Sequence, residues 1–151
     1  SIISICPINA LDVLITDDDA LEEDLKAIEE NGGNVVVYEN CGGAKSVDRL
    51  IDEDAEDIYQ AIAERYLAIG CSVMTPDTNR YELLERLLDE YQVEGVVEMT
   101  LQACHTYNIE AKSIEKRVKE KGLPYIHIET DYSQADVGQL DTRIAAFLEM
   151  I

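Results

Sequence analysis

Residues 93–107, Val93-Glu94-Gly95-Val96-Val97-Glu98-Met99-Thr100-Leu101-Gln102-Ala103-Cys104-His105-Thr106-Tyr107, decide the fold. An apolar, valine-rich run leads into a polar loop, and a charged helical pattern follows the loop. A short apolar run of this kind, bounded by turn residues, predicts a buried strand at 92–99. The loop that follows holds Gln102, Cys104 and His105, whose side chains can form hydrogen bonds, bind metals or take part in catalysis.

Two further strand-like runs end in similar loops. Residues 35–38 lead into Glu39-Asn40-Cys41-Gly42-Gly43, and residues 124–128 lead into Glu129-Thr130-Asp131-Tyr132-Ser133. If the three strands are parallel neighbours, all three loops open at the same edge of one sheet. That edge is where open α/β sheets bind their ligands.

Apolar spacing predicts the remaining elements. Strands are expected at 2–5 and 12–16, and a short helix near 47–51. The helix at 54–68 has the apolar stripe Ile58, Ala61, Ile62 and Tyr66, and Thr78 is expected to cap the helix after it. Helices with the usual apolar spacing are expected at 20–30, 54–68, 79–91, 109–121 and 135–150.

This alternation of elements indicates a fold class. It predicts an open, doubly wound α/β fold of the Rossmann or flavodoxin-like kind, with a mainly four-stranded parallel sheet and helices on both faces. A length of 151 residues is typical of one domain, so we expect residues 1–151 to form a single unit.

The net charge of the chain makes some classes of binding partner unfavourable. Twelve basic residues stand against 32 acidic ones, which gives a formal net charge of -20. Such a surface repels phosphate backbones and anionic lipid, which disfavours binding to nucleic acid or membranes. No apolar run approaches the ~20 residues that cross a bilayer, and residues 1–7 lack the pattern of a signal peptide. We therefore expect a cytoplasmic location.

The four cysteines, Cys6, Cys41, Cys71 and Cys104, are widely spaced and form no CxxC pair. This spacing favours neither a zinc ribbon nor a thioredoxin-type redox motif. An isolated cysteine is usually a small buried apolar residue. Cys41 and Cys104, however, each follow a predicted strand and can converge with Asp131 over one sheet edge. Two thiolates at such an edge suggest a soft ligand, such as an iron–sulfur cluster.

A thiolate–imidazole pair is a second interpretation of this loop. His105 follows Cys104 directly and could activate its thiol as a nucleophile. Adjacent residues usually point in different directions, so we disfavour this pairing.

Charged residues near the loops offer a third interpretation. Their carboxylates could form an oxygen-rich site for a divalent metal, although solvated loop carboxylates are the favoured explanation. The carboxylates in question are Glu39, Glu98, Glu129 and Asp131. Lys45 and Arg143 are predicted to be surface charges.

The same loops resemble a known family. The resembling stretches are 39–43, 65–72, 101–107 and 128–133, and the match continues through 136–140 and 142–147. On these residues the chain resembles the subunits of 2-hydroxyacyl-CoA dehydratases and benzoyl-CoA reductases, together with the related double-cubane cluster proteins. Residues 1–24 match this family poorly.

The resemblance implies that this chain is a fragment or the C-terminal α/β domain of a longer subunit, with a separate N-terminal domain. It implies an iron–sulfur cluster, [4Fe-4S] or double-cubane, with Cys41 and Cys104 as ligands and Cys71 as a further candidate in the double-cubane branch. Substrate would bind near the loops that hold Glu39, Gln102, His105, Asp131 and Tyr132, while the catalytic residues are not assigned.

The resemblance also implies a reaction and partners. A separate ATP-hydrolysing activator would inject one electron, and a partner dehydratase subunit would complete the enzyme. An acyl-CoA substrate would then lose water by radical elimination. Two alternatives stay open: a double-cubane domain for reduction or electron transfer, and an isolated folded fragment with no activity of its own.

Overall fold

The structure is a computed structural model that describes residues 2–4, 12–15, 32–40, 43–71, 73–131 and 137–151. Its elements in chain order are β1 (Ile2–Ser4), β2 (Asp12–Ile15), β3 (Val35–Glu39), α2 (Ala44–Val47), α3 (Ile58–Leu67), α4 (Thr78–Glu90), β4 (Val96–Leu101), α5 (His105–Glu120), β5 (Tyr125–Thr130) and α6 (Val137–Leu148). The helix expected at 20–30 lies outside the described residues.

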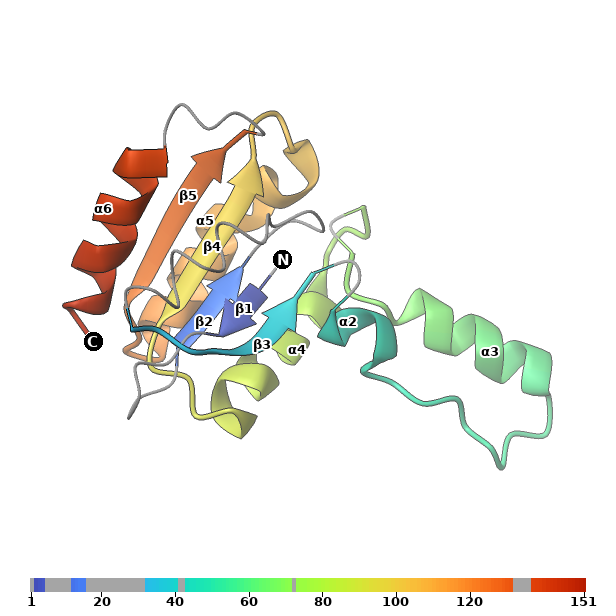
Figure 1. Ribbon diagram of the computed structural model, residues 1–151. Helices are drawn as coiled ribbons and strands as arrows, with labels where there is room; N and C mark the ends of the chain where they lie inside the picture. Colours follow the sequence, from blue (N-terminus) through green and yellow to red (C-terminus); the bar gives the residue numbers. More distant parts are fainter. Residues whose placement is uncertain (1, 5–11, 16–31, 41–42, 72, 132–136) are drawn as a thin grey trace.

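The sheet has the strand order β1-β3-β2-β4-β5, with β1 also paired to β2 and β4. Figure 1 shows β2, β4 and β5 side by side, with β4 in the middle. β4 pairs in parallel with β5 over six residue pairs, from Val96↔Tyr125 to Leu101↔Thr130. β2 runs parallel to β4 and to β3. The three-residue β1 is antiparallel and pairs with β2, β3 and β4. Residues 16–31, which connect β2 to β3, lie outside the described residues. The doubly wound fold class therefore remains a prediction.

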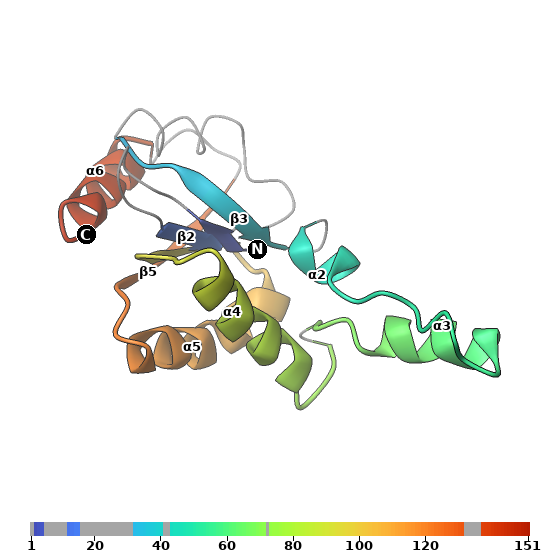
Figure 2. The same cartoon turned by 90° about the horizontal axis from the view of Figure 1, so that it is seen from below.

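Helices lie against both faces of this sheet, with α4 and α5 on one face and α6 on the other (Figure 2). Side chains alternate along β4, so Val96 joins the α4–α5 core and Val97 joins the α6 core. The α4–α5 core consists of Val37, Leu83, Leu84, Leu87, Leu88, Val93, Val96, Ile114 and Val118. The α6 core consists of Val97, Met99, Ile128, Leu140, Ile144 and Phe147.

Several element boundaries differ from the sequence prediction. The strand expected at 92–99 is β4, which begins at Val96, and α5 begins directly after Cys104 instead of at 109. β5 continues through Thr130, so Asp131 follows the strand at once. The short helix expected near 47–51 is instead α2, which ends at Val47. Apolar spacing locates the body of an element well and its ends poorly, because the ends depend on capping contacts.

The start of α4 shows such a capping contact. We expected Thr78 to cap this helix, but the capping residue is Asp77, whose Oδ1 accepts a hydrogen bond from Arg80 N at 3.4 Å. A carboxylate oxygen at this position satisfies a backbone N–H that has no partner within the helix. Arg80, three residues after this cap, lies on the buried side of the helix.

Helix α3 stands away from the sheet at one end of the molecule (Figure 1). Its spacing predicted a buried apolar stripe, but within α3 only Ala61 is buried, while Ile58 and Tyr66 are 47% and 62% exposed. The stripe therefore does not pack on the sheet as an amphipathic helix usually does. In the part of the chain that the structure describes, no helix is long and apolar enough to cross a membrane.

Candidate functional site

The carboxyl ends of β4 and β5 meet at one edge of the sheet, because the two strands are parallel. The backbone N–H of Gln102 donates a hydrogen bond to Thr130 O at 2.6 Å, which joins the ends of the two strands at this edge. A shallow pocket of about 270 Å³ opens there, lined by Gln102, Glu129, Thr130 and Asp131. Two residues that the sequence singled out, Gln102 and Asp131, thus come together. Their role in binding remains a prediction.

Cys104 lies in the short loop between β4 and α5. It occupies the N-cap position of α5, makes no side-chain capping bond, and is a free, half-buried thiol. Ala103 before it has a φ of 63°, in the left-handed region that non-glycine residues rarely adopt. The loop is therefore sharply bent. The N-terminal end of a helix carries a partial positive charge, so the start of α5 favours negative charge nearby.

His105 is the first residue of α5, and its side chain is exposed. Its backbone N–H donates to Ala103 O at 2.9 Å. Among the contacts of the described residues, no hydrogen bond joins its ring to the thiol of Cys104. The geometry therefore offers nothing in favour of the thiolate–imidazole pair.

Cys71 is a second free, half-buried thiol, in the turn that leads from α3 toward α4. Its neighbour Gly70 packs so closely on α4 that an added Cβ would come within 2.6 Å of the backbone N and Cα of Arg80. This glycine lets the Cys71 segment approach the first turn of α4. Two other candidates, Cys41 and Tyr132, lie outside the described residues, as does Cys6.

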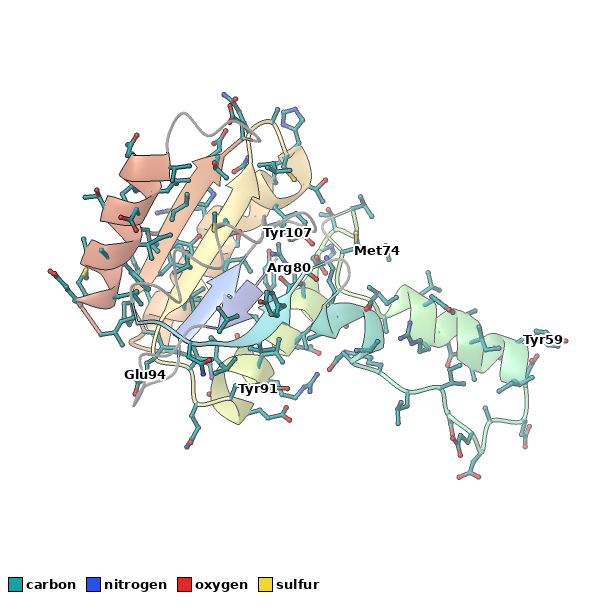
Figure 3. The ribbon with its side chains drawn as sticks, in the orientation of Figure 1. Tyr59, Met74, Arg80, Tyr91, Glu94 and Tyr107 are labelled. Atoms are coloured by element: carbon teal, nitrogen blue, oxygen red, sulfur yellow. The ribbon has the colours of Figure 1, made fainter. Side chains whose placement is uncertain are left out.

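A buried ionic network lies at the carboxyl end of β3. The fully buried Arg80 donates to Glu39 Oε2 from Nε at 3.3 Å and from Nη2 at 3.1 Å. Its Nη1 donates to Glu110 Oε2 of α5 at 2.5 Å. The guanidinium also lies over the ring of Tyr107, 4.7 Å from its centroid (Figure 3). One arginine therefore joins β3, α4 and the first turns of α5.

Lys45 is a second cation in this network, which corrects its prediction as a surface charge. Its side chain is only 4% exposed, and Nζ donates to the hydroxyl of Tyr107 at 2.5 Å. The same Nζ lies 3.9 Å from Glu39 Oε1. The network thus connects residues on both sides of the Cys41 loop to the helix that follows Cys104.

The four carboxylates that we expected to be solvated loop groups lie in two different places in the structure. Glu39 and Glu98 are fully buried in strands, on the face toward α4 and α5. Glu129 and Asp131 line the edge pocket. The four do not form one oxygen-rich site. In the described part of the chain, no group of three or more His, Cys, Asp or Glu side chains could hold a metal ion.

Burial and neighbouring charges shift the pKa values of these acids. Burial alone would raise the pKa of Glu39, but the charges of Arg80 and Lys45 outweigh it and hold the pKa below its usual value. Burial raises the pKa of Glu98, although the hydrogen bond that Tyr125 donates to its Oε2 acts in the opposite direction. Burial, together with the charge of Glu110, raises the pKa of Asp77 to about 6.

A second pocket of about 400 Å³ opens at the outer edge of β5. It is lined by Asn108, Ala111, Lys112, Glu115, Tyr125, Ile126, His127 and Arg143. Nε2 of His127 lies 2.8 Å from Oγ1 of Thr100, and burial lowers the pKa of its imidazole. Arg143 is half-buried and donates to His127 O at 2.8 Å, so it is more than the surface charge we predicted.

Sequence reasoning missed Arg80 as a central residue. A usable signal was present, because Arg80 precedes Leu83 and Leu84 by three and four residues and so lies on the same helix face. A charged residue at the start of an apolar stripe indicates either a helix end or a buried ion pair. Its partners, Glu39 and Glu110, are 41 and 30 residues away and carry no local pattern.

Comparison with known proteins identifies the family. Residues 13–151 match the family described as 2-hydroxyglutaryl-CoA dehydratase, D-component. This chain belongs to that family, which confirms the resemblance found in the sequence. The match begins within β2, so the unmatched segment covers only the first 12 residues.

Named relatives agree with this assignment. An Escherichia coli (strain K12) protein, provisionally named dehydratase subunit YjiM, is 53% identical over 133 residues, which are 87% of this chain and 34% of that protein. The (R)-phenyllactyl-CoA dehydratase beta subunit of Clostridium sporogenes is 24% identical over 96% of this chain and 39% of its own length. A benzoyl-CoA reductase subunit of Thauera aromatica is 29% identical over 79% of this chain and 28% of its own length. The chain thus spans about a third of the length of these relatives.

Proposed function

We propose that this chain is the part of a 2-hydroxyacyl-CoA dehydratase-type subunit that supplies cysteine ligands to an iron–sulfur cluster of the [4Fe-4S] kind. The proposed ligands are Cys104 and Cys41. One observation carries this proposal: Cys104 is a free, half-buried thiol at the carboxyl end of β4, where the edge pocket also opens. The family and the names of its relatives support the type of subunit.

The chemistry of the available donors fits such a group. Thiolates are the usual ligands of iron–sulfur clusters. Cys104 offers its thiol at the N-terminal end of α5, where the helix dipole favours negative charge. Cys41 follows β3 by two residues and lies outside the described part of the chain.

A bound cluster would supply single-electron transfer and a Lewis acid for the thioester carbonyl. The chain's own residues would bind and orient the substrate. Gln102 is exposed at the edge pocket and can donate or accept a hydrogen bond there. His105 is exposed on the first turn of α5, where its imidazole can form a hydrogen bond with a bound substrate.

For the whole enzyme we propose the ATP-activated radical elimination of water from a hydroxyacyl-CoA. Its partners would be an ATP-hydrolysing activator, a second dehydratase subunit and the remainder of the family-length subunit. The proposed location is the cytoplasm. These proposals follow from family membership and from relatives whose names describe acyl-CoA dehydratase subunits.

A double-cubane domain for reduction or electron transfer is the second candidate, and one observation favours it. Cys71 is also a free, half-buried thiol, and Gly70 holds its segment against the first turn of α4, beside the network that reaches Glu39. A larger cluster would need this third thiolate. The remaining alternative is a folded fragment without activity of its own.

Iron retention distinguishes these candidates. The complete subunit is reconstituted with iron and sulfide without oxygen, and iron per chain is counted together with thiolate-to-iron absorption. We expect Cys104→Ser and Cys41→Ser to lose most of the iron, while the control Cys6→Ser keeps it. If Cys71→Ser retains its iron, the result favours the dehydratase-type cluster. If Cys71→Ser loses its iron, the result favours the double-cubane cluster. If the unsubstituted subunit keeps no iron, or if every variant keeps it all, the cluster proposal is wrong.

A further inference from the structure

Helix α3 exposes an apolar face that the described part of the protein leaves uncovered. Ala63 lies four residues after Tyr59, and Tyr66 and Leu67 lie three and four residues after Ala63, so the four residues share one face of the helix. Tyr59, Tyr66 and Leu67 are 81%, 62% and 65% exposed. Figure 3 shows Tyr59 at the far end of the helix, pointing away from the sheet.

This helix has little support from the domain itself. Only Ala61 of its ten residues is buried. Arg65 ties it to the end of α2 by donating to Ser46 O and, at 3.0 Å, to Arg49 O. Isolated helices shorter than ~12 residues are marginal in water, and most helices are stabilised by packing of an apolar face. The exposed face of α3 therefore has the properties of a surface that is buried in an assembly.

The residue types on this face favour a protein partner. Tyrosine is enriched among the residues that carry most of the binding energy at interfaces, because it buries a large area with few rotatable bonds. Two tyrosines and a leucine on one helical face give a compact anchor. Large exposed apolar patches on soluble domains mark such sites.

Charge beside the face indicates the chemistry of that partner. Five acids precede or cap the helix within six residues, and all are exposed: Asp52, Glu53, Asp54, Glu56 and Asp57. In a symmetric pair of identical chains, this acidic segment would lie near its own copy, and like charges would repel. The chain as a whole carries -20. A partner surface with lysine or arginine around an apolar centre fits far better.

We propose that the exposed face of α3 is the docking surface for a second, non-identical subunit of the dehydratase assembly, which presents an apolar patch bordered by basic residues. This inference rests on the proposed function only for the identity of the partner as a dehydratase subunit. The aromatic and acidic character of the surface comes from the chain itself.

A photo-crosslinking residue at position 59 tests this proposal in the complete subunit, expressed in cells that make the whole enzyme. The matched control has the same residue in place of Tyr91, which is 39% exposed at the end of α4, on the body of the domain. We expect position 59 to crosslink a different polypeptide, identified by its sequence as a dehydratase-family subunit, at a peptide with apolar and basic residues. A crosslink within the same chain or to a second copy overturns the proposal, and so does one no stronger than at position 91.

A second variant tests the affinity of this face. The probe is the partner polypeptide that the crosslink identifies, purified by itself without the crosslink. Tyr59→Ser with Tyr66→Ser should leave the circular dichroism unchanged, because both side chains are exposed, and weaken binding by at least about tenfold. Binding that equals that of the unsubstituted chain overturns the assignment of this face. Iron content is measured in the same samples. Intact docking without iron would count against the proposed cluster and not against the docking surface.

Discussion

Arg80 donates two hydrogen bonds to one carboxylate oxygen of Glu39, and both side chains are fully buried. This pair joins the first turn of α4 to the carboxyl end of β3. Glu110 and Tyr107 on α5 complete the contact around the same guanidinium. The segments that flank two cysteine loops are thus held by a single arginine.

Replacement of Arg80 by methionine should strongly destabilise the fold. It removes the cation that bonds both Glu39 and Glu110 and leaves Glu39 only Lys45, whose Nζ is 3.9 Å away. Breaking a buried pair in this way costs about 3–5 kcal/mol. Urea unfolding measures the free energy of unfolding. Arg117→Met is the matched control, since Arg117 bonds Glu85 at 2.7 Å and lies over the ring of Tyr81, but the two charged groups are 37% and 44% exposed. We expect this control to lose less than about 1 kcal/mol. Equal losses in the two variants would contradict the central role of Arg80.

Asp77→Asn should change how stability depends on pH. The pKa of Asp77 is raised in the folded protein to about 6, from an ordinary value of 3.8. The folded state therefore binds this proton more tightly than the unfolded state does, so the stability contributed by the protonated acid is present below pH 4 and is lost as pH rises through 6. Asparagine still caps α4 but cannot ionise. The variant should match the unsubstituted protein near pH 4 and exceed it in stability at pH 7, as measured by thermal unfolding.

The opposite order would refute the shift at Asp77. If Asp77→Asn is less stable than the unsubstituted protein at pH 7 and the gap closes on acidification, the carboxylate is stabilising when ionised. The pKa of Asp77 would then be lowered by its capping role and not raised by burial.

Tyr125→Phe should destabilise the protein through Glu98. The Tyr125 hydroxyl donates to Glu98 Oε2, while Oε1 of the same buried acid has no hydrogen-bond partner among the described residues. Removal of the donor leaves the whole carboxyl group unsatisfied, at a cost of about 1–3 kcal/mol. Adding Glu98→Gln to Tyr125→Phe should recover part of this loss, because a neutral amide is cheaper to bury than a group that can ionise. Denaturant unfolding of the four proteins of this cycle measures the coupling, and additive losses would argue against the pair.

The sequence predicted those features of the fold that local patterns govern. Valine-rich runs located β3 and β4, and the apolar spacing of Leu140, Ile144 and Phe147 located the buried face of α6. Glycine at position 122, with a φ of 80°, ends α5 close to the predicted place.

The features that could not be predicted from the sequence depend on contacts between residues far apart in the chain. Lys45 resembles any surface lysine in sequence, and its burial depends on Tyr107, 62 residues later. Exposure of Tyr66 could not be foreseen either, because an amphipathic stripe indicates only that something covers it. Whether the cover is the domain's own sheet or another protein is decided by tertiary structure.

Protection of Cys104 from alkylation tests the central claim most directly. The complete subunit is treated with a thiol reagent before and after anaerobic loading with iron and sulfide, and each cysteine-containing peptide is quantified by mass spectrometry. As a half-buried, free thiol, Cys104 should react in the iron-free protein and become protected, together with Cys41, when iron is bound. Equal labelling of Cys104 in the two states, in a protein that has retained iron, would show that this thiol is not a ligand and would contradict the account.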